Sequence, residues 1–592
     1  MSGEDIHARR DAAIAQQVRV VSEPAPFFVE ACPGSGKTRV IVDRHVADPT
    51  PRGRPGRALV SFTRASAGEL RARCRAHSRP DLAEYPHFIG TIDRFFWLYL
   101  VRPACLPLAS GTSPRRWQRI ESWDRIQASV YGGWALADFT FRRDPGEQQC
   151  RAELRPTERN RGQYEKANDQ ERRDAEDSAV LCRDRLMSQG YITGHEVRVL
   201  ALQNVRTDAA RTRTGLLNRF GEVVVDEAQD CSALDLAILH TLRTSGLPIV
   251  LVGDLNQAIY AFRGAQPHLV RRFASDLGTQ LPLSGNWRSS PAICSFAHTL
   301  RPATGHRRPD DAVGQHHAEP SPVVLLTSKK NQIDSACAAF HAQADTLEIP
   351  PSERLIVAHA SIRLPGSAQW RNRGTQHAGT KQLVWAAAVI EHRDPDQLEL
   401  ALEIIERALL RIWSGQEIDG ASIEAVCDAA AIDRNGLRAF AATLTLPSLD
   451  LASLKDWCTE ANLALRRTPP APHLIAGNKG RLAARKPAAA QPPRKAIGIA
   501  AEVDNPVQGR CEVVHQVKGR EADAVLLVIP DDHRLDRLLA QWEVGADDEA
   551  LRVLYVAATR ARRLLAVSVP ERCVDRVEAH LARHGVPTNR KT

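Results

Sequence analysis

The 592-residue sequence has no Cys-x-x-Cys pair and no apolar run that approaches about 18 residues. Its twelve cysteines are scattered from Cys32 to Cys573, so neither a zinc ribbon nor a disulfide framework is indicated. The missing apolar run and the polar stretch from Met1 to Arg10 argue against membrane insertion and secretion. We therefore expect a reduced, cytoplasmic location.

The sequence has an excess of positive charge and otherwise the composition of a globular protein. Net charge is +9, from 79 Lys and Arg against 70 Asp and Glu, with 43% hydrophobic residues. At roughly 150 residues per domain the length allows about four domains. The positive balance is compatible with a polyanionic partner, although it does not require one.

A glycine-rich turn follows an apolar strand near the N-terminus and opens an apolar-periodic helix. The turn contains Gly34, Ser35, Gly36, Lys37 and Thr38. Glycines let backbone N–H groups turn toward phosphate oxygens, the lysine reaches the β and γ phosphates, and the threonine hydroxyl ligates Mg²⁺. The pattern predicts a nucleotide-binding loop. Because no Asn-Lys-x-Asp follows this loop, a GTPase is disfavoured.

Two further strand ends carry polar groups suited to nucleotide hydrolysis. Three valines precede Asp226 and Glu227, which places adjacent carboxylates at the end of a buried strand. Asp226 can complete the Mg²⁺ shell through water while Glu227 polarises the attacking water. Gln257 follows the next such strand and can sense the γ-phosphate.

Other polar and aromatic residues are candidates for contacts with bases. In the first predicted helix, Gln16 or Gln17 could read an adenine edge, and both are equally compatible with a surface position. Thr63 and Arg64 follow a predicted strand, where open α/β sheets bind ligands. The aromatic and cationic group that follows Gln257 has a base-stacking composition, with a place in the core as its alternative: Tyr260, Phe262 and Arg263.

The hydrophobic pattern alternates between parallel-sheet and helical regions. Residues 98–218 read as an inserted helical subdomain, with an alternating-sign charge run over residues 151–185 that is typical of a solvated helix face. A βαβ unit over residues 323–358 indicates a second α/β domain. Its sheet continues with strands at 511–514 and 524–529, a final helix over 551–562, and a closing strand at 564–569.

The second domain is also interrupted by helix. Within residues 381–467 one apolar face is expected in the core: Leu398, Leu402, Ile405, Leu409 and Ile412. Residues 468–495 are rich in Pro, Ala and basic side chains, which favours a flexible linker that contributes little packed structure.

The order and spacing of these pieces, in at least eight motifs from Gln16 to about Val569, resemble the UvrD/Rep branch of the superfamily 1 helicases. The resemblance implies an α/β fold of two RecA-like P-loop NTPase domains, each with a mainly helical insertion. The implied divisions are 1–97, 98–215, 216–285, 286–365, 366–505 and 506–592. The first and third form one domain, the fourth and sixth the other, and the second and fifth are the insertions.

The resemblance also implies roles for residues around the nucleotide. Gln16, rather than Gln17, would read adenine, and Arg39 and Trp287 would sandwich its ring. Lys37, Thr38, Asp226 and Glu227 keep the roles given above, with ATP and Mg²⁺ as cofactors. Gln257 would approach the γ-phosphate together with Arg288 and Arg560 of the second domain. Glu521 of the second domain would contact the ribose.

The implied partner is single-stranded DNA or a 3′-tailed duplex, with 3′-to-5′ travel. The expected DNA-facing positions are Phe62, Thr63, Arg64, Thr91, Tyr260, Phe262, Arg263 and His515. Asp93 stands where many relatives carry His, and Phe262 where relatives often carry Trp. The second insertion is short, so we expect a compact member that translocates better than it unwinds.

The resemblance implies work in DNA repair, recombination or antiviral defence, and two alternatives remain. One is an ATP-gated DNA sensor or regulatory subunit beside a nuclease in a defence complex, and the other is an RNA helicase. No stretch after Val569 is long enough to hold a nuclease domain, so a nuclease would be a separate partner. Oligomeric state is not indicated by the sequence.

Overall fold

The computed structural model forms two compact units. The first is Met1–Ala104, Leu200–Asn372 and Glu502–Thr592, and the second is Cys105–Val199 and Arg373–Ala501. The structure describes residues 3–105, 117–120, 123, 130–142, 150–156, 160–259, 266–303, 309–328, 333–360, 363–365, 379–392, 397–414, 423–477, 480–499 and 509–591. The six-part division expected from the sequence stays a prediction.

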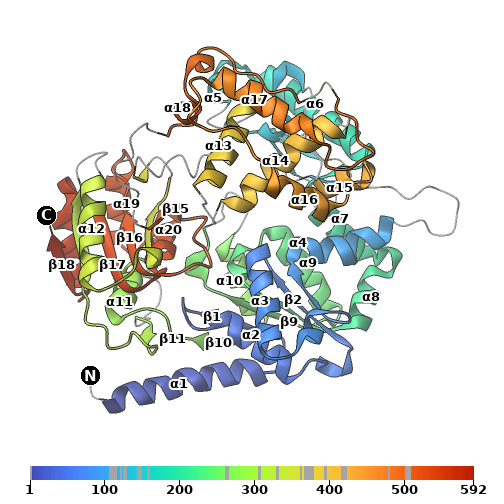
Figure 1. Cartoon of the computed structure of the whole chain (residues 1–592). Coiled ribbons are helices and arrows are strands. Elements are labelled where there is room, and N and C mark those ends of the chain that lie inside the picture. Colours follow the sequence, from blue (N-terminus) through green and yellow to red (C-terminus); the bar gives the residue numbers. More distant parts are fainter. Residues whose placement is uncertain are drawn as a thin grey trace. The chain divides into compact units, whose positions relative to one another are not determined.

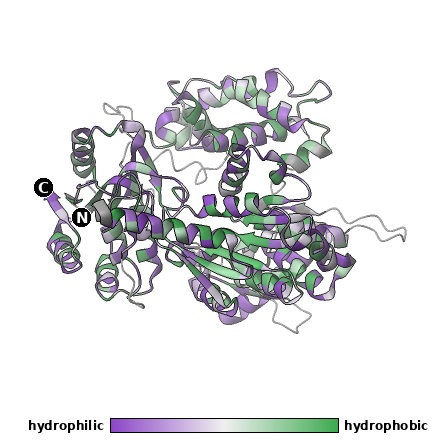
Figure 2. Cartoon of the chain, turned by 90° about the horizontal axis from the view of Figure 1, so that it is seen from below, coloured by the Kyte–Doolittle hydropathy of each residue, from purple (hydrophilic) through white to green (hydrophobic). Residues whose placement is uncertain are grey.

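The first unit contains two six-stranded parallel sheets, which confirms the predicted α/β class. The first sheet has the strand order β10-β1-β9-β8-β2-β3. Its strands are β1 (Phe27–Ala31), β2 (Gly56–Ser61), β3 (Phe88–Thr91), β8 (Phe220–Val225), β9 (Ile249–Gly253) and β10 (Thr279–Leu283). Strands of such a sheet are covered on both faces, so they read as apolar runs, as Figure 2 shows by colour.

Helices pack on the first sheet and supply the segments that follow its strands. They are α1 (Gly3–Ser22), α2 (Lys37–Ala47), α3 (Arg64–Ala76), α4 (Ile92–Phe96), α8 (Thr212–Arg219), α9 (Ala233–Thr244) and α10 (Pro267–Asp276) (Figure 1). One core cluster joins Val40 and Ile41 of α2 and Leu70 of α3 to Val29 and Val252 of the strands. The strand ends that precede the nucleotide-binding loop and the acidic pair are thereby held in one layer.

The second sheet has the strand order β15-β14-β16-β17-β13-β18. Its strands are β13 (Val323–Ser328), β14 (Arg354–Ala358), β15 (Arg510–Val513), β16 (Ala522–Val528), β17 (Ala561–Pro570) and β18 (Thr588–Lys591). Alternate residues face opposite layers. Leu326 and Ile356 pack with Phe340 of α12 (Asp334–Thr346), while Leu325 and Val357 belong to the cluster on the other face.

That other face of the second sheet is covered by four helices, α11 (Pro291–Thr299), α19 (Leu535–Glu543), α20 (Glu549–Ala558) and α21 (Val574–Arg583). Two sequence predictions are wrong here. The helix expected over 551–562 ends at Ala558 and is followed by α21, so it is not the final helix. The strand expected to close the sheet, β17, lies between β16 and β13, and β18 forms the edge. The apolar run of β17 reflects this central position.

A separate two-stranded parallel ladder is formed by residues that lie between the two six-stranded sheets in the sequence. β11 (Gly285–Asn286) pairs with β12 (Asp311–Ala312). Helix α1 packs on this ladder, since Arg10 Nε donates to the Val313 carbonyl at 2.7 Å and a Cβ added to Gly285 would lie 2.4 Å from Ala13 Cβ. The segment that carries Trp287 and Arg288 is therefore fixed in place.

The first stretch of the second unit is less helical than the sequence indicated. It contains the helices α5 (Arg161–Lys166) and α6 (Asp169–Ser188), the start of α7 (Gly194–Thr207), and four short strands. The strands are β4 (Gln118–Arg119), β5 (Phe139–Arg142), β6 (Arg151–Leu154) and β7 (Tyr191–Ile192), with β5 and β6 antiparallel. Trp134, Phe139 and Phe141 pack with Ala175 and Ala179 of α6. The aromatic core explains why strands form despite the charge run.

The second stretch of this unit is helical, as predicted. Its helices are α13 (Thr380–Glu391), α14 (Leu398–Trp413), α15 (Ile423–Ala429), α16 (Arg434–Thr443), α17 (Leu454–Arg467) and α18 (Pro493–Ala496). On α14, Ile405, Leu409 and Ile412 are buried as expected, but Leu398 is 41% exposed. Leu398 is the first residue of the helix, where fewer neighbours reach it, so its assignment to the core was wrong.

The flexible linker predicted over residues 468–495 makes fixed contacts with the helices where it is described, although Pro493 is the only one of its described residues that is buried. The Asn462 side chain of α17 exchanges two hydrogen bonds with the Leu482 backbone, each 2.9 Å long. The Leu454 N–H donates to the Gln491 carbonyl at 2.7 Å, and Arg494 pairs with Asp450 at 2.7 Å. The Pro-rich composition fixes an extended course over the helices rather than leaving the segment free.

None of the helices in the described part of the chain combines the length and hydrophobicity that spanning a membrane requires.

Candidate ATP and nucleic-acid site

The predicted nucleotide-binding loop connects β1 to α2. Gly34 and Gly36 have φ of 70° and 83°, the left-handed region that favours glycine. A Cβ on Gly34 would lie 2.6 Å from both Arg288 Cβ and Asn286 Oδ1, so the loop requires glycine there for space as well. The Trp287 N–H donates to the Gly34 carbonyl at 2.9 Å. The loop is thereby joined to the segment that carries Arg288.

The polar groups of this loop are arranged to receive an anion. The loop runs directly into the N-terminus of α2, which begins at Lys37, and a helix N-terminus attracts negative charge. Lys37 and Thr38 are half-buried at this start. The Ser35 hydroxyl is buried and has no hydrogen-bond partner within the described residues. An unpaired buried hydroxyl is costly, so the loop fits a bound phosphate oxygen.

The two candidate adenine-reading glutamines have different neighbours. The Gln16 side chain contacts Ser284, accepting from its N–H at 2.9 Å and donating to its hydroxyl at 3.1 Å. Gln17 Nε2 donates to the Ser35 carbonyl at 2.9 Å, directly on the loop. Gln16 as the adenine contact stays a prediction, and Gln17 has a position that supports the loop.

The expected adenine sandwich of Arg39 and Trp287 also stays a prediction. Arg39 is an exposed residue of α2 whose guanidinium lies 3.5 Å from Asp43. The Trp287 side chain is half-buried, and its indole Nε1 is buried without a hydrogen-bond partner in the described part of the chain. An indole in this state has a polar group available for a ligand.

The acidic pair follows β8, in the middle of the first sheet. The Asp226 N–H donates to the Val60 carbonyl of β2 at 2.8 Å, which continues the ladder past the strand end. Glu227 has a φ of 55°, and its N–H donates to Asp226 Oδ1 at 2.9 Å. Gln229 donates to the Glu227 carboxylate through Nε2. The left-handed turn and these bonds fix the position of each carboxylate.

Burial and mutual repulsion give the two carboxylates opposite pKa shifts. Burial, together with the adjacent Glu227 charge, raises the pKa of Asp226. Burial also opposes ionisation of Glu227, but the charges of Lys37 and Lys518 outweigh it and lower its pKa. Two buried carboxylates side by side fit a divalent cation, because the cation removes the cost of holding both ionised.

Mg²⁺ prefers oxygen ligands and usually keeps several waters and substrate phosphates in its shell. Asp226 and the Thr38 hydroxyl would supply the protein ligands. When bound, the cation would neutralise the phosphate charge that develops during hydrolysis.

Gln257 and Arg560 meet in the described structure. Gln257 follows β9 of the first sheet, and Arg560 lies between α20 and β17 of the second. Arg560 Nη2 donates to Gln257 Oε1 at 3.1 Å, and its Nε donates to the Val556 carbonyl at 2.9 Å. Burial, and then the nearby charge of Arg288, lower the pKa of Arg560 to about 9. A buried, electrostatically disfavoured guanidinium fits an anionic group of the substrate.

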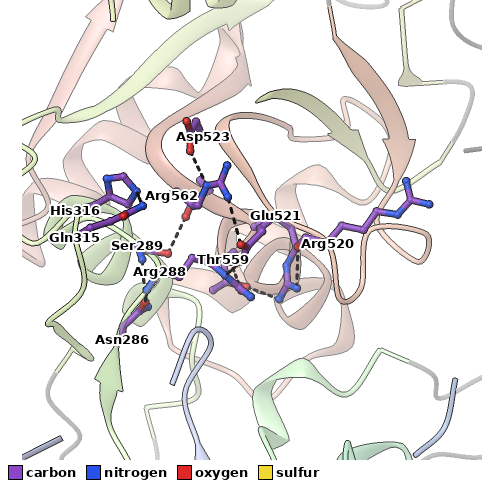
Figure 3. Close-up of polar contacts among 12 residues, drawn as sticks. Asn286, Arg288, Ser289, Gln315, His316, Arg520, Glu521, Asp523, Thr559 and Arg562 are labelled. Atoms are coloured by element: carbon purple, nitrogen blue, oxygen red, sulfur yellow. Dashed lines mark hydrogen bonds and ion pairs between the residues drawn. The ribbon is translucent and has the colours of Figure 1, made fainter. Parts of the chain in front are cut away.

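Arg288 is held by an ion pair with Glu521 (Figure 3). Its Nε donates to Glu521 Oε2 at 2.6 Å and its Nη1 to the Thr559 carbonyl at 3.1 Å. Arg562 Nη1 contacts the other carboxylate oxygen of Glu521 at 3.3 Å. Burial would raise the pKa of Glu521, but Arg288 and Arg562 lower it. The ribose role of Glu521 stays a prediction, and its carboxylate also orients two arginines.

The candidate DNA-facing residues of the first sheet lie at one edge. Thr63 lies just after β2, and Thr91 is the last residue of the neighbouring strand β3, where it pairs with Ser61. Each threonine hydroxyl caps a helix, accepting from the Ser66 N–H at 3.0 Å and the Arg94 N–H at 3.3 Å. Capping fixes the two side chains near the surface. Phe62 is half-buried beside Thr63, and Arg64 is exposed.

His515, the candidate from the second sheet, follows β15. Its ring centroid lies 6.1 Å from that of His359, which follows the adjacent strand β14. His515 and His359 therefore lie at the same edge of their sheet. Three expected DNA contacts, Tyr260, Phe262 and Arg263, lie outside the described residues. Asp93 is half-buried in the first turn of α4.

Several residues at this site were not found from the sequence. Gln229, two positions after Glu227, could have been found, because a polar side chain in the same turn is close enough to contact the carboxylate. Asn286 and Asp254 likewise contact residues two and three positions away, Arg288 and Gln257. The remaining residues have no local signal, since their partners lie in distant segments: His359, Lys518 and Tyr555.

Comparisons with known proteins agree with this geometry. The family model for the UvrD/REP helicase N-terminal domain matches residues 13–106 and 144–278. The chain is 26% identical to the ATP-dependent DNA helicase UvrD2 of Mycobacterium tuberculosis over 613 aligned positions, 93% of this chain and 78% of that protein. It is 26% identical to DNA helicase II of Haemophilus influenzae over 303 positions, 48% of this chain and 39% of that protein.

A third relative is the RecBCD enzyme subunit RecB of Mycobacterium tuberculosis, with 31% identity over 163 positions, 25% of this chain and 14% of that protein. The matches agree with the two parallel α/β sheets as RecA-like domains. Residues 13–106 and 144–278 therefore match the UvrD/REP helicase N-terminal domain, and the chain as a whole is similar to UvrD/Rep-type superfamily 1 helicases.

Proposed function

We propose that this protein uses ATP and Mg²⁺ to move 3′-to-5′ along single-stranded DNA. Its similarity to UvrD/Rep-type proteins indicates an ATP-dependent DNA helicase; the direction, the residue roles and the biological setting are our proposal. The contact that best supports it is the one between Gln257 and Arg560 at 3.1 Å. It joins the strand ends of the first sheet to an arginine of the second sheet at the site of the acidic pair.

Hydrolysis would begin with phosphates bound by the loop between β1 and α2. The backbone N–H groups of the loop and Lys37 would hold the β and γ phosphates. Glu227, held by Gln229, would orient the attacking water and accept its proton. Arg288 and Arg560 would stabilise the charge of the transition state, so hydrolysis would require both sheets to be engaged.

Movement along DNA would require the contacts between protein and bases to break and form again in each cycle. The DNA strand would be contacted by Phe62, Thr63 and Arg64 after β2, Thr91 at the end of β3 and His515 after β15. Stacking on aromatic groups tolerates any base at about 1–3 kcal/mol per base, so grip need not depend on sequence. Each cycle of ATP binding and hydrolysis would shift one group of contacts along the strand.

Strand separation is part of the proposed activity. Translocation without efficient unwinding was expected because the second insertion is short and residues 468–495 were expected to contribute little packed structure to it. Since the described residues of that segment are hydrogen-bonded to the helices of the second unit, that part of the reason no longer holds. We infer that the protein unwinds as well as translocates.

DNA repair or recombination is the setting that the relatives support. The local match to RecB favours a second candidate, in which the chain works beside a nuclease as an ATP-gated subunit. A role in antiviral defence and the choice of an RNA substrate remain less supported alternatives. The two main candidates share the ATP site and differ in whether the chain alone unwinds DNA.

The test measures ATPase activity with single-stranded DNA, duplex DNA and RNA as separate activators. Single-stranded DNA should stimulate most, and Glu227→Gln should keep ATP binding while abolishing turnover, because the amide has the same shape and cannot act as base. Glu84→Gln, at an exposed position, is the matched control. Stronger stimulation by RNA would contradict the DNA assignment.

Direction and unwinding are tested with blocked and tailed substrates. We expect faster ATP-driven release of streptavidin from a 5′-biotin than from a 3′-biotin, as 3′-to-5′ travel requires, together with unwinding of a 3′-tailed duplex. Stimulated ATPase without either activity would favour the regulatory subunit.

A further inference from the structure

Gln257 is held between two groups of opposite hydrogen-bonding character. Its Nε2 donates to Asp254 Oδ2 at 3.0 Å, and its Oε1 accepts from Arg560 Nη2 at 3.1 Å. All three side chains are buried. An ionised carboxylate only accepts and a guanidinium only donates, so the orientation of the amide is fixed by chemistry. Its carbonyl end must face Arg560.

Asp254 is itself held by a residue of the second sheet's helix α20. Tyr555 is fully buried, and its hydroxyl donates to Asp254 Oδ2 at 3.0 Å across 301 residues of sequence. Arg301 Nη2 donates to the same hydroxyl at 2.9 Å and pairs with Asp310. Because Arg301 can only donate, the phenol proton must point to Asp254. Hydrogen bonds from Arg301 through Tyr555, and from Arg560 through Gln257, therefore converge on the Asp254 carboxylate.

These hydrogen bonds lie close to the nucleotide-binding loop. The charges of Asp310, Arg301 and Asp254 all act on the buried Cys32 thiol, which directly follows β1, and burial is the largest cause of its raised pKa. Asp254 also accepts from the Asn256 N–H at 3.0 Å, which fixes the turn that leads to Gln257. A shift of Asp254 would therefore move both the amide and its backbone.

We propose that Tyr555 is a positioning residue for ATP hydrolysis, which orients the Gln257 amide toward Arg560 through Asp254. The inference rests on the proposed function, since it requires Gln257 and Arg560 to act at the γ-phosphate. Asp254 and Gln257 follow β9 of the first sheet, whereas Tyr555 and Arg560 come from α20 and the segment after it. The amide is therefore oriented only while both sets of residues are in contact.

Tyr555→Phe removes the hydroxyl and keeps the ring that packs in the core. We expect kcat to fall about ten-fold, the effect of one hydrogen bond to a charged group. KM for ATP and the affinity for ADP should stay within about two-fold of the wild type, because no group that binds the nucleotide is changed. Tyr99→Phe is the matched control, since it removes a hydroxyl from the aromatic cluster of Phe88, Phe95 and Phe220.

The decisive experiment is a double-mutant cycle between Tyr555→Phe and Gln257→Ala, with kcat measured at saturating ATP and single-stranded DNA. If Tyr555 acts through Gln257, the double variant should be no slower than Gln257→Ala alone. Independent, multiplicative losses would overturn the inference, as would an unchanged kcat for Tyr555→Phe. A wild-type protein without ATPase activity would instead overturn the proposed function.

A second variant keeps the test valid if Tyr555→Phe folds poorly. Asp254→Asn leaves one acceptor oxygen where the carboxylate has two, so either the Asn256 N–H or the Gln257 and Tyr555 donors must face an NH2 group. We expect a larger loss of kcat than in Tyr555→Phe, again with ADP affinity retained. Wild-type kcat in Asp254→Asn would contradict the proposed orientation of the amide.

Discussion

Lys518 Nζ donates to Asp230 Oδ2 at 2.6 Å, with only 6% and 2% of the two side chains exposed. Asp230 follows the acidic pair of the first sheet, and Lys518 lies in the segment between β15 and β16 of the second. Lys518 Nζ also lies 3.5 Å from the Gln257 carbonyl oxygen. This buried ion pair joins the two sheets beside the candidate catalytic residues.

Lys518→Met should destabilise the protein by about 3–5 kcal/mol, because it leaves the Asp230 carboxylate buried without its cation. Adding Asp230→Asn removes that charge and should restore part of the loss. The free energy of unfolding from urea denaturation measures both effects, with the exposed Lys455→Met as control. A Lys518→Met protein as stable as the wild type would mean that the pair is not maintained in solution.

Arg560→Ala should lower kcat on the order of 10³-fold and leave ADP affinity nearly intact, since the arginine stabilises charge that develops in the transition state. Arg560→Lys keeps the charge but loses the planar fork, so it should recover only part of the rate. Steady-state ATPase and fluorescent ADP titration measure the two quantities. An equal loss of ADP binding would make Arg560 a structural residue.

Arg64→Ala should weaken single-stranded DNA binding to a similar extent for all sequences and reduce the salt dependence of log K by about one charge. Arg73→Ala lies on the same helix and is paired with Glu69 at 2.8 Å, so it serves as control. Fluorescence anisotropy over a range of salt concentrations measures both slopes. Equal effects of the two substitutions would indicate a general charge effect rather than a contact by Arg64.

Stability should fall as pH decreases from about 6.5 to about 4, in part because of His45. Burial, against a hydrogen bond to the Leu82 carbonyl at 3.0 Å, lowers the pKa of His45 to about 4. The unfolded chain, with a His pKa of about 6.5, binds the proton first as pH falls, so protonation favours unfolding.

His45→Gln should make the melting temperature less dependent on pH in this window, because glutamine keeps a donor for the Leu82 carbonyl and cannot titrate. Melting curves at half-unit pH steps measure the slope. An unchanged slope would mean that His45 does not contribute to the pH dependence.

The strands and the first-sheet half of the site could be predicted from local sequence. The valines before Asp226 and the glycines around Ser35 can be interpreted from a few neighbouring residues. A covered parallel strand is an apolar run, and a phosphate-binding loop needs its glycines close together in the sequence. Each of these groups follows a strand at its carboxyl end, where ligand sites of open sheets are expected. The structure places them together for that reason.

The second-sheet half of the site had no such local signal. Glu521 precedes β16 and Arg560 precedes β17, at the amino ends of these strands, so the rule about carboxyl ends does not find them. Only the resemblance to a family pointed to them. The fixed contacts of residues 468–495 were missed for a related reason, since composition describes a segment and not the helices against which it lies.

The sequence by itself determined which chemical groups this protein has for binding and hydrolysing a nucleotide, because these groups lie beside successive strands in a recognisable order along the chain. Only the tertiary structure decided how those groups are oriented. The direction of the Gln257 amide depends on Asp254, Tyr555 and Arg560, and two of these lie about 300 residues away. Hydrogen bonds between such distant segments form only when the sheets fold and meet, and no local spacing encodes them.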